Sequence, residues 1–240
     1  MKLLCLLVAF SFFPTAYAFI PDVLPQNQRS FSSDSLSAEA TFGMGCFWKP
    51  SEELLKVPGV TETIAGYTGK ANAESPPNYE SVCFSYEWVE GVRVVYDETQ
   101  LEYDALLDAF FEAQEPKLGS RQYSSVIFPH DDTQQRIAAD WLERNCNRLR
   151  GDGVATSWTT VEPLANFYRA ENYHQRYWQK TRPRVAGMIA LLAIATGILD
   201  GWTPEAWQEN VHTVANATVL AGLFYVLIER RIDTKVVQLS

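Results

Sequence analysis

Residues 41–48 read TFGMGCFW, so Cys46 stands behind two glycines and directly ahead of the aromatic pair Phe47 and Trp48. The residues before it are short and apolar enough to end a buried strand. Residues 50–55 (PSEELL) read as the first turns of a helix, with proline tolerated early and acids near the positive end. Cys46 is therefore expected at a helix N-terminus, where unpaired N–H groups favour a thiolate. The stretch indicates either a nucleophilic thiol in aromatic surroundings or a buried structural cysteine, since free cysteine is among the most buried residue types.

The composition narrows the classes of protein that are possible. The chain has 240 residues, of which 47% are hydrophobic, enough for one full-sized domain with appendages. A net charge of -9 excludes a nucleic-acid partner, because no basic surface is available to follow phosphates. The spacing of the cysteines fits neither a metal site nor a disulfide framework, so we expect no metal and a reducing compartment. The four cysteines are Cys5, Cys46, Cys83 and Cys146.

The first 40 residues predict a targeting region. Residues 1–18 hold one lysine, an apolar run and the small-residue end Ala16-Tyr17-Ala18, which is typical of a secretory signal peptide. A membrane span is less favoured here, because Pro14 interrupts the run and a span needs roughly 20 apolar residues. Residues 19–40 are rich in serine without apolar periodicity, and they predict a disordered leader.

Residues 41–184 alternate between strand-like and helix-like segments. The strand candidates are residues 61–67, 91–96 and 122–128, and the helix candidates are residues 103–111, 133–149 and 170–180. Interleaved elements of this kind favour an α/β sandwich or an α+β domain.

Residues 185–240 differ in character and predict an apolar helical hairpin. Residues 185–199 are apolar on every face, residues 211–228 nearly so, and the connection 200–210 carries three acids and two tryptophans. The outer flanks are basic; they carry Arg182, Arg184, Arg230 and Arg231. This pattern predicts a hairpin that spans a membrane, with both ends on the positive side. The alternative is a buried or dimer-forming hairpin, because the first stretch is short for a hydrocarbon core of about 30 Å.

Seven collinear blocks extend the pattern around the cysteine. They are residues 45–48 (GCFW), 58–60 (PGV), 66–69 (GYTG), 78–83 (NYESVC), 94–97 (VVYD), 121–125 (RQYSS) and 167–175 (FYRAENYHQ). Over about residues 41–180 the chain resembles the peptide methionine sulfoxide reductases of the A type. The resemblance implies an α+β fold, a two-layer sandwich whose mixed sheet has flanking helices and a ferredoxin-like core. It also implies thiol-dependent reduction of peptide or free methionine-S-sulfoxide, in repair of oxidative damage, with no bound cofactor.

The resemblance assigns roles to four residues in the reaction itself. Cys46 would attack the sulfoxide sulfur and become a sulfenic acid. Glu90 would supply the proton for the sulfoxide oxygen, which requires desolvation to raise its pKa; the apolar Trp88 and Val89 precede it. Tyr79 and Tyr123 would hold the sulfoxide oxygen.

Further roles follow from the same resemblance. Phe47 and Trp48 would form the apolar wall that accepts the substrate methyl group. His174 and Glu171 are interpreted as structural hydrogen-bonding residues. Between Gly119 and Gln122 the chain lacks the loop that brings an aspartate to the site in the family.

The thiol that would regenerate Cys46 is not evident, because no cysteine follows Cys146. The candidates for a resolving cysteine are Cys146, on the charged helix, and Cys83, in a segment expected to be buried. Otherwise an external thiol of the thioredoxin or glutaredoxin type must reduce the sulfenic acid directly. Two alternatives to an enzyme remain open. One is a degenerate, membrane-tethered module, and the other is a thiol sensor that joins Cys46 to a second cysteine.

The junction of Ala16-Tyr17-Ala18 with Phe19 resembles the bipartite plastid presequence of algae with complex plastids, such as diatoms. This similarity predicts entry by the secretory route and delivery to the plastid, with membrane association through residues 185–228. The acids Asp22 and Asp34 favour the alternative, a secreted or endomembrane protein.

Overall fold

A computed structural model of the chain describes residues 37–145, 158–233 and 235–239. The predicted signal peptide, most of the predicted leader and Cys146 lie outside these residues. The described residues divide into two units, one made of those up to residue 178 and from residue 233 onward, and the other of residues 179–232.

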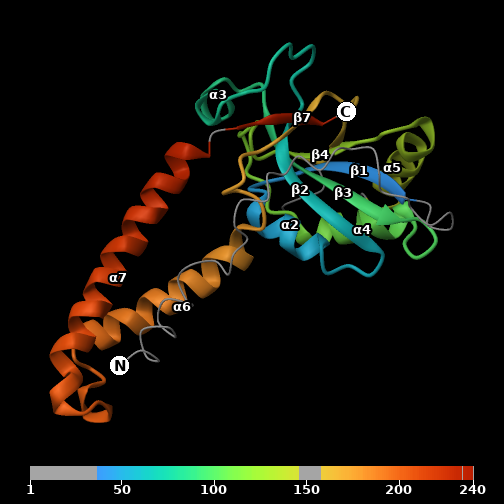
Figure 1. Cartoon of the computed structure of the whole chain (residues 1–240). Coiled ribbons are helices and arrows are strands. Elements are labelled where there is room, and N and C mark those ends of the chain that lie inside the picture. Colours follow the sequence, from blue (N-terminus) through green and yellow to red (C-terminus); the bar gives the residue numbers. More distant parts are fainter. Residues whose placement is uncertain (1–36, 146–157, 234, 240) are drawn as a thin grey trace, which may run out of the picture. The chain divides into compact units, whose positions relative to one another are not determined.

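A seven-stranded sheet forms the first unit (Figure 1). Its strands are β1 (Ser37–Met44), β2 (Val60–Thr68), β3 (Val89–Asp97), β4 (Ser125–Phe128), β5 (Thr160–Val161), β6 (Phe167–Arg169) and β7 (Val237–Leu239). The order across the sheet is β5-β4-β1-β3-β2-β6-β7. All neighbours are antiparallel except β4 and β5, so the sheet is mixed. The central order β4-β1-β3-β2 is the ferredoxin-like arrangement, and the predicted α+β class is confirmed.

Helices α2 (Trp48–Leu54), α4 (Tyr103–Ala113) and α5 (Asp132–Asn145) contact one another in a row and, with the sheet, form two layers. The core between the layers is apolar because the buried face of α4 repeats at helical spacing. Leu106, Leu107 and Phe110 are fully buried, and the Phe110 ring stacks on Phe42 of β1 with 4.8 Å between centroids. A fourth helix, α3 (Tyr79–Phe84), follows the proline-containing loop after β2.

Glycines on β2 and β3 make room for an aromatic ring on the sheet. Gly66 of β2 pairs with Gly91 of β3, and a Cβ on Gly66 would collide with the ring of Phe167. The guanidinium of Arg93 lies over the same ring, 4.7 Å from its centroid. A larger residue at Gly66 would therefore displace β6 from its place beside β2.

Three boundaries differ from the sequence prediction. β1 begins at Ser37, inside the stretch predicted as a disordered leader, because residues 37–40 pair with β3. The predicted helix over residues 170–180 begins only at Tyr177, after turns that include Arg176 at φ 49°. The last described residues, predicted as part of the hairpin, form β7 and pair with β6.

The second unit is helical. It is built from α6 (Tyr177–Ala195, which begins in the first unit), the short 3-10 helix η2 (Asp200–Trp202) and α7 (Glu205–Ile232). Leu191 of α6 packs with Ala215 and Val219 of α7. Arg184 donates to both carboxylate oxygens of Glu229, at 2.8 and 3.1 Å. The predicted hairpin therefore has its own small core and its own ion pair.

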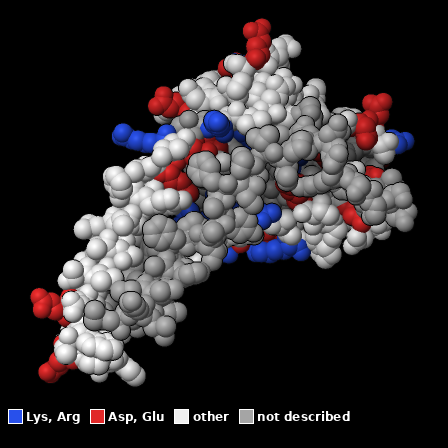
Figure 2. All heavy atoms as spheres, viewed as in Figure 1, with Lys and Arg blue, Asp and Glu red and all other residues white. Residues whose placement is uncertain are grey.

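Within the described residues, α7 is the one helix that is long and apolar enough to cross a membrane. Only 6% of its most apolar stretch is buried inside the protein. The exposed side chains include Leu220, Leu223, Phe224 and Leu227. In Figure 2 the described surface of this unit is mostly uncharged, and acidic side chains gather at its free end.

Candidate active site

The turn between β1 and α2 places Cys46 just beyond the C-terminal end of β1, a central strand of the sheet. Gly45 has φ 83°, and a Cβ on it would collide with the backbone carbonyl of Glu115. The Glu115 N–H donates to the carbonyl of Met44 at 2.8 Å, so the segment after α4 lies directly against this turn. Only a residue without a side chain fits, and the glycine therefore determines where Cys46 lies.

The environment of Cys46 differs in two ways from the prediction. α2 begins at Trp48, so its first turn holds no acidic residue. Burial raises the pKa of Cys46, and the nearby Glu90 carboxylate adds to this effect. A hydrogen bond from the Trp48 backbone N–H and the charge of Lys117 act in the opposite direction. The prediction that the helix N-terminus favours a thiolate is therefore wrong for the free site, where desolvation is the larger effect.

Glu90 on β3 lies against Cys46 and is only 3% exposed. Gln122 donates its side-chain amide to one carboxylate oxygen at 2.7 Å, and the Phe47 backbone N–H donates to the other at 3.2 Å. The Cys46 thiol is a further hydrogen-bond partner. Burial nevertheless dominates these contacts and raises the pKa of Glu90 to about 7. The side chain can therefore both hold and release a proton near neutral pH, as predicted for the proton donor.

The two tyrosines predicted to hold the sulfoxide oxygen lie near the same carboxyl. Tyr79 begins α3, whose first turn is capped by the Asn78 side chain accepting from Ser81 N–H at 2.7 Å. Burial raises the pKa of Tyr79, and the charge of Glu90 adds to it. Burial, then Glu90 and Cys46, raises the pKa of Tyr123 to about 12. Both hydroxyls are thus neutral hydrogen-bond donors at physiological pH.

The aromatic wall beside Cys46 is held by residues from the block around His174. Phe47 is buried, with its ring centroid 5.1 Å from that of His174. Trp48 donates its indole N–H to His174 Nδ1 at 2.9 Å and stacks on Tyr177 at 3.9 Å. Tyr67 donates its hydroxyl to Glu171 at 2.9 Å. His174 and Glu171 thus form hydrogen bonds with the aromatic side chains Trp48 and Tyr67.

Cys83 lies closer to the site than the sequence suggested. It was expected in a buried segment, but its thiol is half-buried and lies 3.7 Å from the Gln122 side-chain amide. Its thiol also hydrogen bonds to the Tyr79 hydroxyl, one helical turn earlier on α3. The structure thus brings Cys83 together with the groups around Cys46, whereas the other candidate, Cys146, lies outside the described residues.

Sequence reasoning missed two residues of this site, Gln122 and Lys117. Gln122 bonds to Glu90 through both its side chain and its backbone, whose carbonyl accepts from the Glu90 N–H at 2.9 Å. Lys117 has its ammonium 4.6 Å from the centroid of the Tyr123 ring. Their proximity to Tyr123 in the sequence was the available signal. In the part of the chain that the structure describes, no three His, Cys, Asp or Glu side chains gather as metal ligands.

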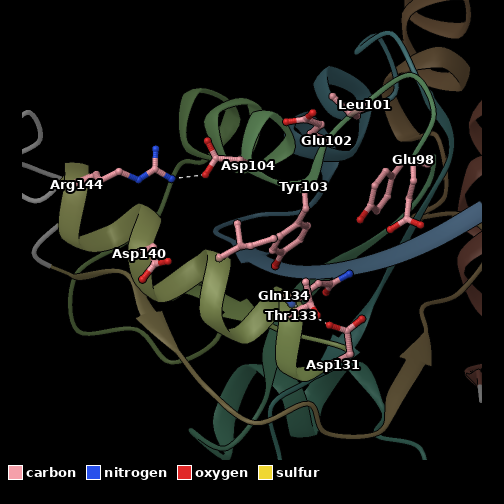
Figure 3. A pocket seen from close by; sticks show the side chains of 12 residues that line it. Glu98, Leu101, Glu102, Tyr103, Asp104, Asp131, Thr133, Gln134, Asp140 and Arg144 are labelled. Atoms are coloured by element: carbon pink, nitrogen blue, oxygen red, sulfur yellow. Dashed lines mark hydrogen bonds and ion pairs between the residues drawn. The ribbon is translucent and has the colours of Figure 1, made fainter.

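A cavity of about 430 Å³ lies elsewhere, at the opposite end of β3 (Figure 3). Its lining is acidic and includes Glu98, Glu102, Asp104, Asp131 and Asp140. Tyr103 points between α4 and α5 in this view, and Arg144 pairs with Asp104 beside it. None of the residues grouped around Cys46 lines this cavity, so it is separate from the thiol site.

Comparisons with known proteins agree with this site. The family model for peptide methionine sulfoxide reductase matches residues 38–194. The chain is 39% identical over 150 residues to peptide methionine sulfoxide reductase MsrA of Geobacter sulfurreducens, covering 59% of this chain and 90% of the relative. It is 38% identical over 165 residues to the MsrA of Methanothermobacter thermautotrophicus, covering 65% and 94%.

Solved structures show the same likeness. Methionine sulfoxide reductase A of Corynebacterium diphtheriae superposes with a TM-score of 0.52 and 28% identity, covering 61% of this chain and 76% of that one. Reduced Mxr1 of Saccharomyces cerevisiae gives a TM-score of 0.51 and 26% identity, covering 63% and 89%. The family model covers more than half of the chain, and its residues include every group described around Cys46. The chain belongs to the peptide methionine sulfoxide reductase family.

Proposed function

We propose that Cys46 carries out the thiol-dependent reduction of methionine sulfoxide that characterises the family, with Glu90 as the proton donor. The observation that supports this most strongly is a buried carboxyl, with a pKa of about 7, in hydrogen-bond contact with the thiol. The non-enzymatic alternative is not favoured, because a degenerate module has no need of a desolvated acid beside an intact nucleophile.

The reaction uses the groups in a definite order. The sulfur of Cys46 attacks the sulfoxide sulfur while Glu90 delivers a proton to the sulfoxide oxygen. The oxygen is transferred to Cys46, which becomes a sulfenic acid, and methionine leaves in its reduced form. The thiol proton replaces the one that Glu90 gave, so atoms and charge balance. The neutral hydroxyls of Tyr79 and Tyr123 donate hydrogen bonds to the oxygen, where negative charge develops in the transition state.

The substrate is methionine-S-sulfoxide, in proteins or free, and the activity repairs oxidised methionine. The apolar Phe47 and Trp48 accept the methyl group on the sulfur, because both present aromatic surface beside the thiol. Trp48 is held in place by His174 and Tyr177, so this wall has a defined orientation.

Cys83 is the resolving cysteine of this proposal. Its thiol attacks the sulfur of the Cys46 sulfenic acid, a disulfide forms, and the hydroxyl leaves as water with the proton of the Cys83 thiol. An external dithiol of the thioredoxin or glutaredoxin type then reduces the disulfide. Contacts of Cys83 with Tyr79 and Gln122 support this assignment, since both residues also face Glu90.

One experiment tests both steps. The full chain, reduced and freed of reductant, is mixed with excess methionine-S-sulfoxide, and the product methionine and the intact protein mass are measured. Wild type should form methionine and lose two hydrogens as the disulfide. Cys83→Ser should form methionine but retain a sulfenic acid that dimedone traps, and Cys46→Ser should form none. Turnover by Cys46→Ser would overturn the proposed function, and a dimedone adduct in wild type would exclude Cys83 as the resolving thiol.

The helical hairpin is proposed to insert in a membrane. The support is the exposed apolar surface of α7 together with the ion pair of Arg184 and Glu229 near one end. Trp202 and Trp207 at the connection between the helices are exposed, and tryptophan is enriched at membrane interfaces.

The proposed location is the plastid of an alga with complex plastids, reached by the secretory route through residues 1–40. The support is the sequence pattern around Phe19 alone. A fluorescent reporter carrying residues 1–40 should accumulate in diatom plastids. Accumulation in the medium or the endomembranes would favour the alternative location.

A further inference from the structure

Lys117 is held at the solvent-facing side of the active site by a short loop. Its backbone N–H donates to the carbonyl of Tyr123 at 3.0 Å, and Ser120 N–H donates to the carbonyl of Lys117 at 3.2 Å. Its ammonium lies over the Tyr123 ring, 4.6 Å from the centroid. A cation over an aromatic face is attracted by the ring quadrupole, so this contact favours the observed position of the charge.

The positive charge of Lys117 is not neutralised by a carboxylate in the described structure. The two other cations near this loop are paired, Lys49 with Glu115 and Arg121 with Glu162. No ion pair of this kind is formed by Lys117 with any described acidic residue. An exposed ammonium without a partner is free to attract an anion that arrives with the substrate.

The reacting groups lie within the electrostatic range of this ammonium. Its charge lowers the pKa of both Cys46 and Glu90. It lies against the ring of Tyr123, the residue that is proposed to hold the sulfoxide oxygen. A charged group attached near the sulfoxide would therefore lie within the range over which the charge of Lys117 already acts on Cys46 and Glu90.

We propose that Lys117 makes the enzyme selective for methionine sulfoxides that carry a carboxylate beside the oxidised residue. This class includes free and C-terminal methionine sulfoxide, and methionine sulfoxide next to aspartate or glutamate. The proposal rests on the reductase function given above and concerns the choice of substrate at the same site.

The test compares two substrates that differ only in charge. N-acetyl-methionine-S-sulfoxide carries a carboxylate, and its N-methylamide does not. The ratio of their kcat/KM values is measured with dithiothreitol, so no protein reductant takes part. Because Lys117 influences Cys46 and Glu90 equally for both substrates, the ratio isolates the contact with the substrate charge.

Wild type should prefer the carboxylate, and Lys117→Gln should lower the ratio by about three- to tenfold, the effect of one solvated ion pair. Lys117→Glu should lower it further, and Lys117→Arg should preserve it. In wild type the ratio should fall as salt is raised. Lys56→Gln is the matched control, since Lys56 is an exposed lysine that pairs with Glu53 on α2. An equal ratio in wild type and Lys117→Gln would overturn the proposal.

Two further measurements separate the possible failures. Two pentapeptides, with glutamate or glutamine after the oxidised methionine, distinguish a side-chain carboxylate from a terminal one. If neither the pentapeptide pair nor the N-acetyl pair shows a preference for the carboxylate, the proposal is wrong. Binding of both N-acetyl compounds to Cys46→Ser, with and without Lys117→Gln, reports the same ratio without turnover. A preference in binding with no turnover by wild type would overturn the reductase function alone.

Discussion

At the scale of single residues, the packing around Cys46 and Glu90 disfavours the charged forms of both side chains. Burial is the largest effect on both Cys46 and Glu90, and it exceeds the hydrogen bonds that favour their charged forms. The Glu90 carboxylate raises the cost of ionising the Cys46 thiol, whereas the hydrogen bond from the thiol favours the charged carboxylate. The raised pKa of Glu90 keeps a proton on its carboxyl up to about neutral pH, which suits a reaction that must deliver a proton to oxygen.

Glu90→Gln should slow the reduction of methionine sulfoxide by roughly 10²–10⁴-fold, the usual contribution of a positioned acid. The amide keeps the shape of the side chain and an oxygen that can accept from Gln122, but it cannot donate the proton. The rate of methionine formation under saturating dithiothreitol measures this. A loss of less than threefold would remove Glu90 from the mechanism.

The same variant should change how stability depends on pH. The pKa of Glu90 is about 7 in the folded chain, against about 4.3 for an unperturbed glutamate. Between these values the unfolded chain releases the proton and the folded chain keeps it, so stability falls as pH rises. The loss should be roughly 3–4 kcal/mol by pH 7.5 in wild type and should be absent in Glu90→Gln. Urea unfolding from pH 4 to 8 measures it, with the exposed Glu102→Gln as a control that keeps the wild-type slope.

At the scale of elements, antiparallel pairing is what joins Cys46 to Glu90 across 44 residues. Gly43 near the end of β1 pairs with Gly91 at the start of β3. Cys46, which follows Gly43, and Glu90, which precedes Gly91, therefore lie at the same end of this strand pair. Tyr67 of β2 pairs with Glu90 on the other side. The acid thus lies on β3, a central strand with β1 on one side and β2 on the other, which explains its burial.

Gly45→Ala should destabilise the chain by about 3 kcal/mol or more and greatly reduce activity, since a Cβ at φ 83° meets the Glu115 carbonyl. Gly119→Ala is the matched control, because its φ is 76° but nothing lies within 4 Å of the added Cβ. That change should cost only about 1 kcal/mol. Urea midpoints of the two variants decide the matter, and equal midpoints would contradict the role given to the Gly45 contact.

At the scale of the whole molecule, the helical unit is inserted between two paired strands. The chain leaves the sheet unit after β6, forms residues 179–232, and returns as β7 beside β6. Val236, just before β7, packs against the core of the sheet unit. The helical unit is thus an insertion in the chain between β6 and β7, joined to the sheet unit at both of its ends.

The full chain should float with lipid vesicles in a density gradient, because α7 exposes apolar side chains that water solvates poorly. The double variant Leu220→Glu and Leu227→Glu should remain at the bottom, since both side chains are exposed and charge is costly in hydrocarbon. Leu164→Glu in the sheet unit is the control and should float like wild type. Flotation of the double variant would mean that this face of α7 does not contact lipid.

Residue types and their spacing were sufficient to predict the fold class, the position of most strands and helices, and the family. Periodicity predicted α4, and the resemblance carried by the block GCFW and its collinear neighbours led to the proposed roles of Cys46, Glu90, Tyr79 and Tyr123. Such features depend on the spacing of residues within short segments, and this spacing does not depend on tertiary packing.

The balance of charge in the site and its remaining residues follow from the packed fold and could not be predicted from the sequence. The raised pKa of Cys46, the bonds of Gln122 to Glu90 and the place of Lys117 over Tyr123 depend on segments brought together from distant parts of the chain. For the same reason Cys83, expected in a buried segment, is half-buried and contacts Gln122 in the site. Desolvation and long-range contacts are properties of the packed molecule, and no local pattern in the sequence records them.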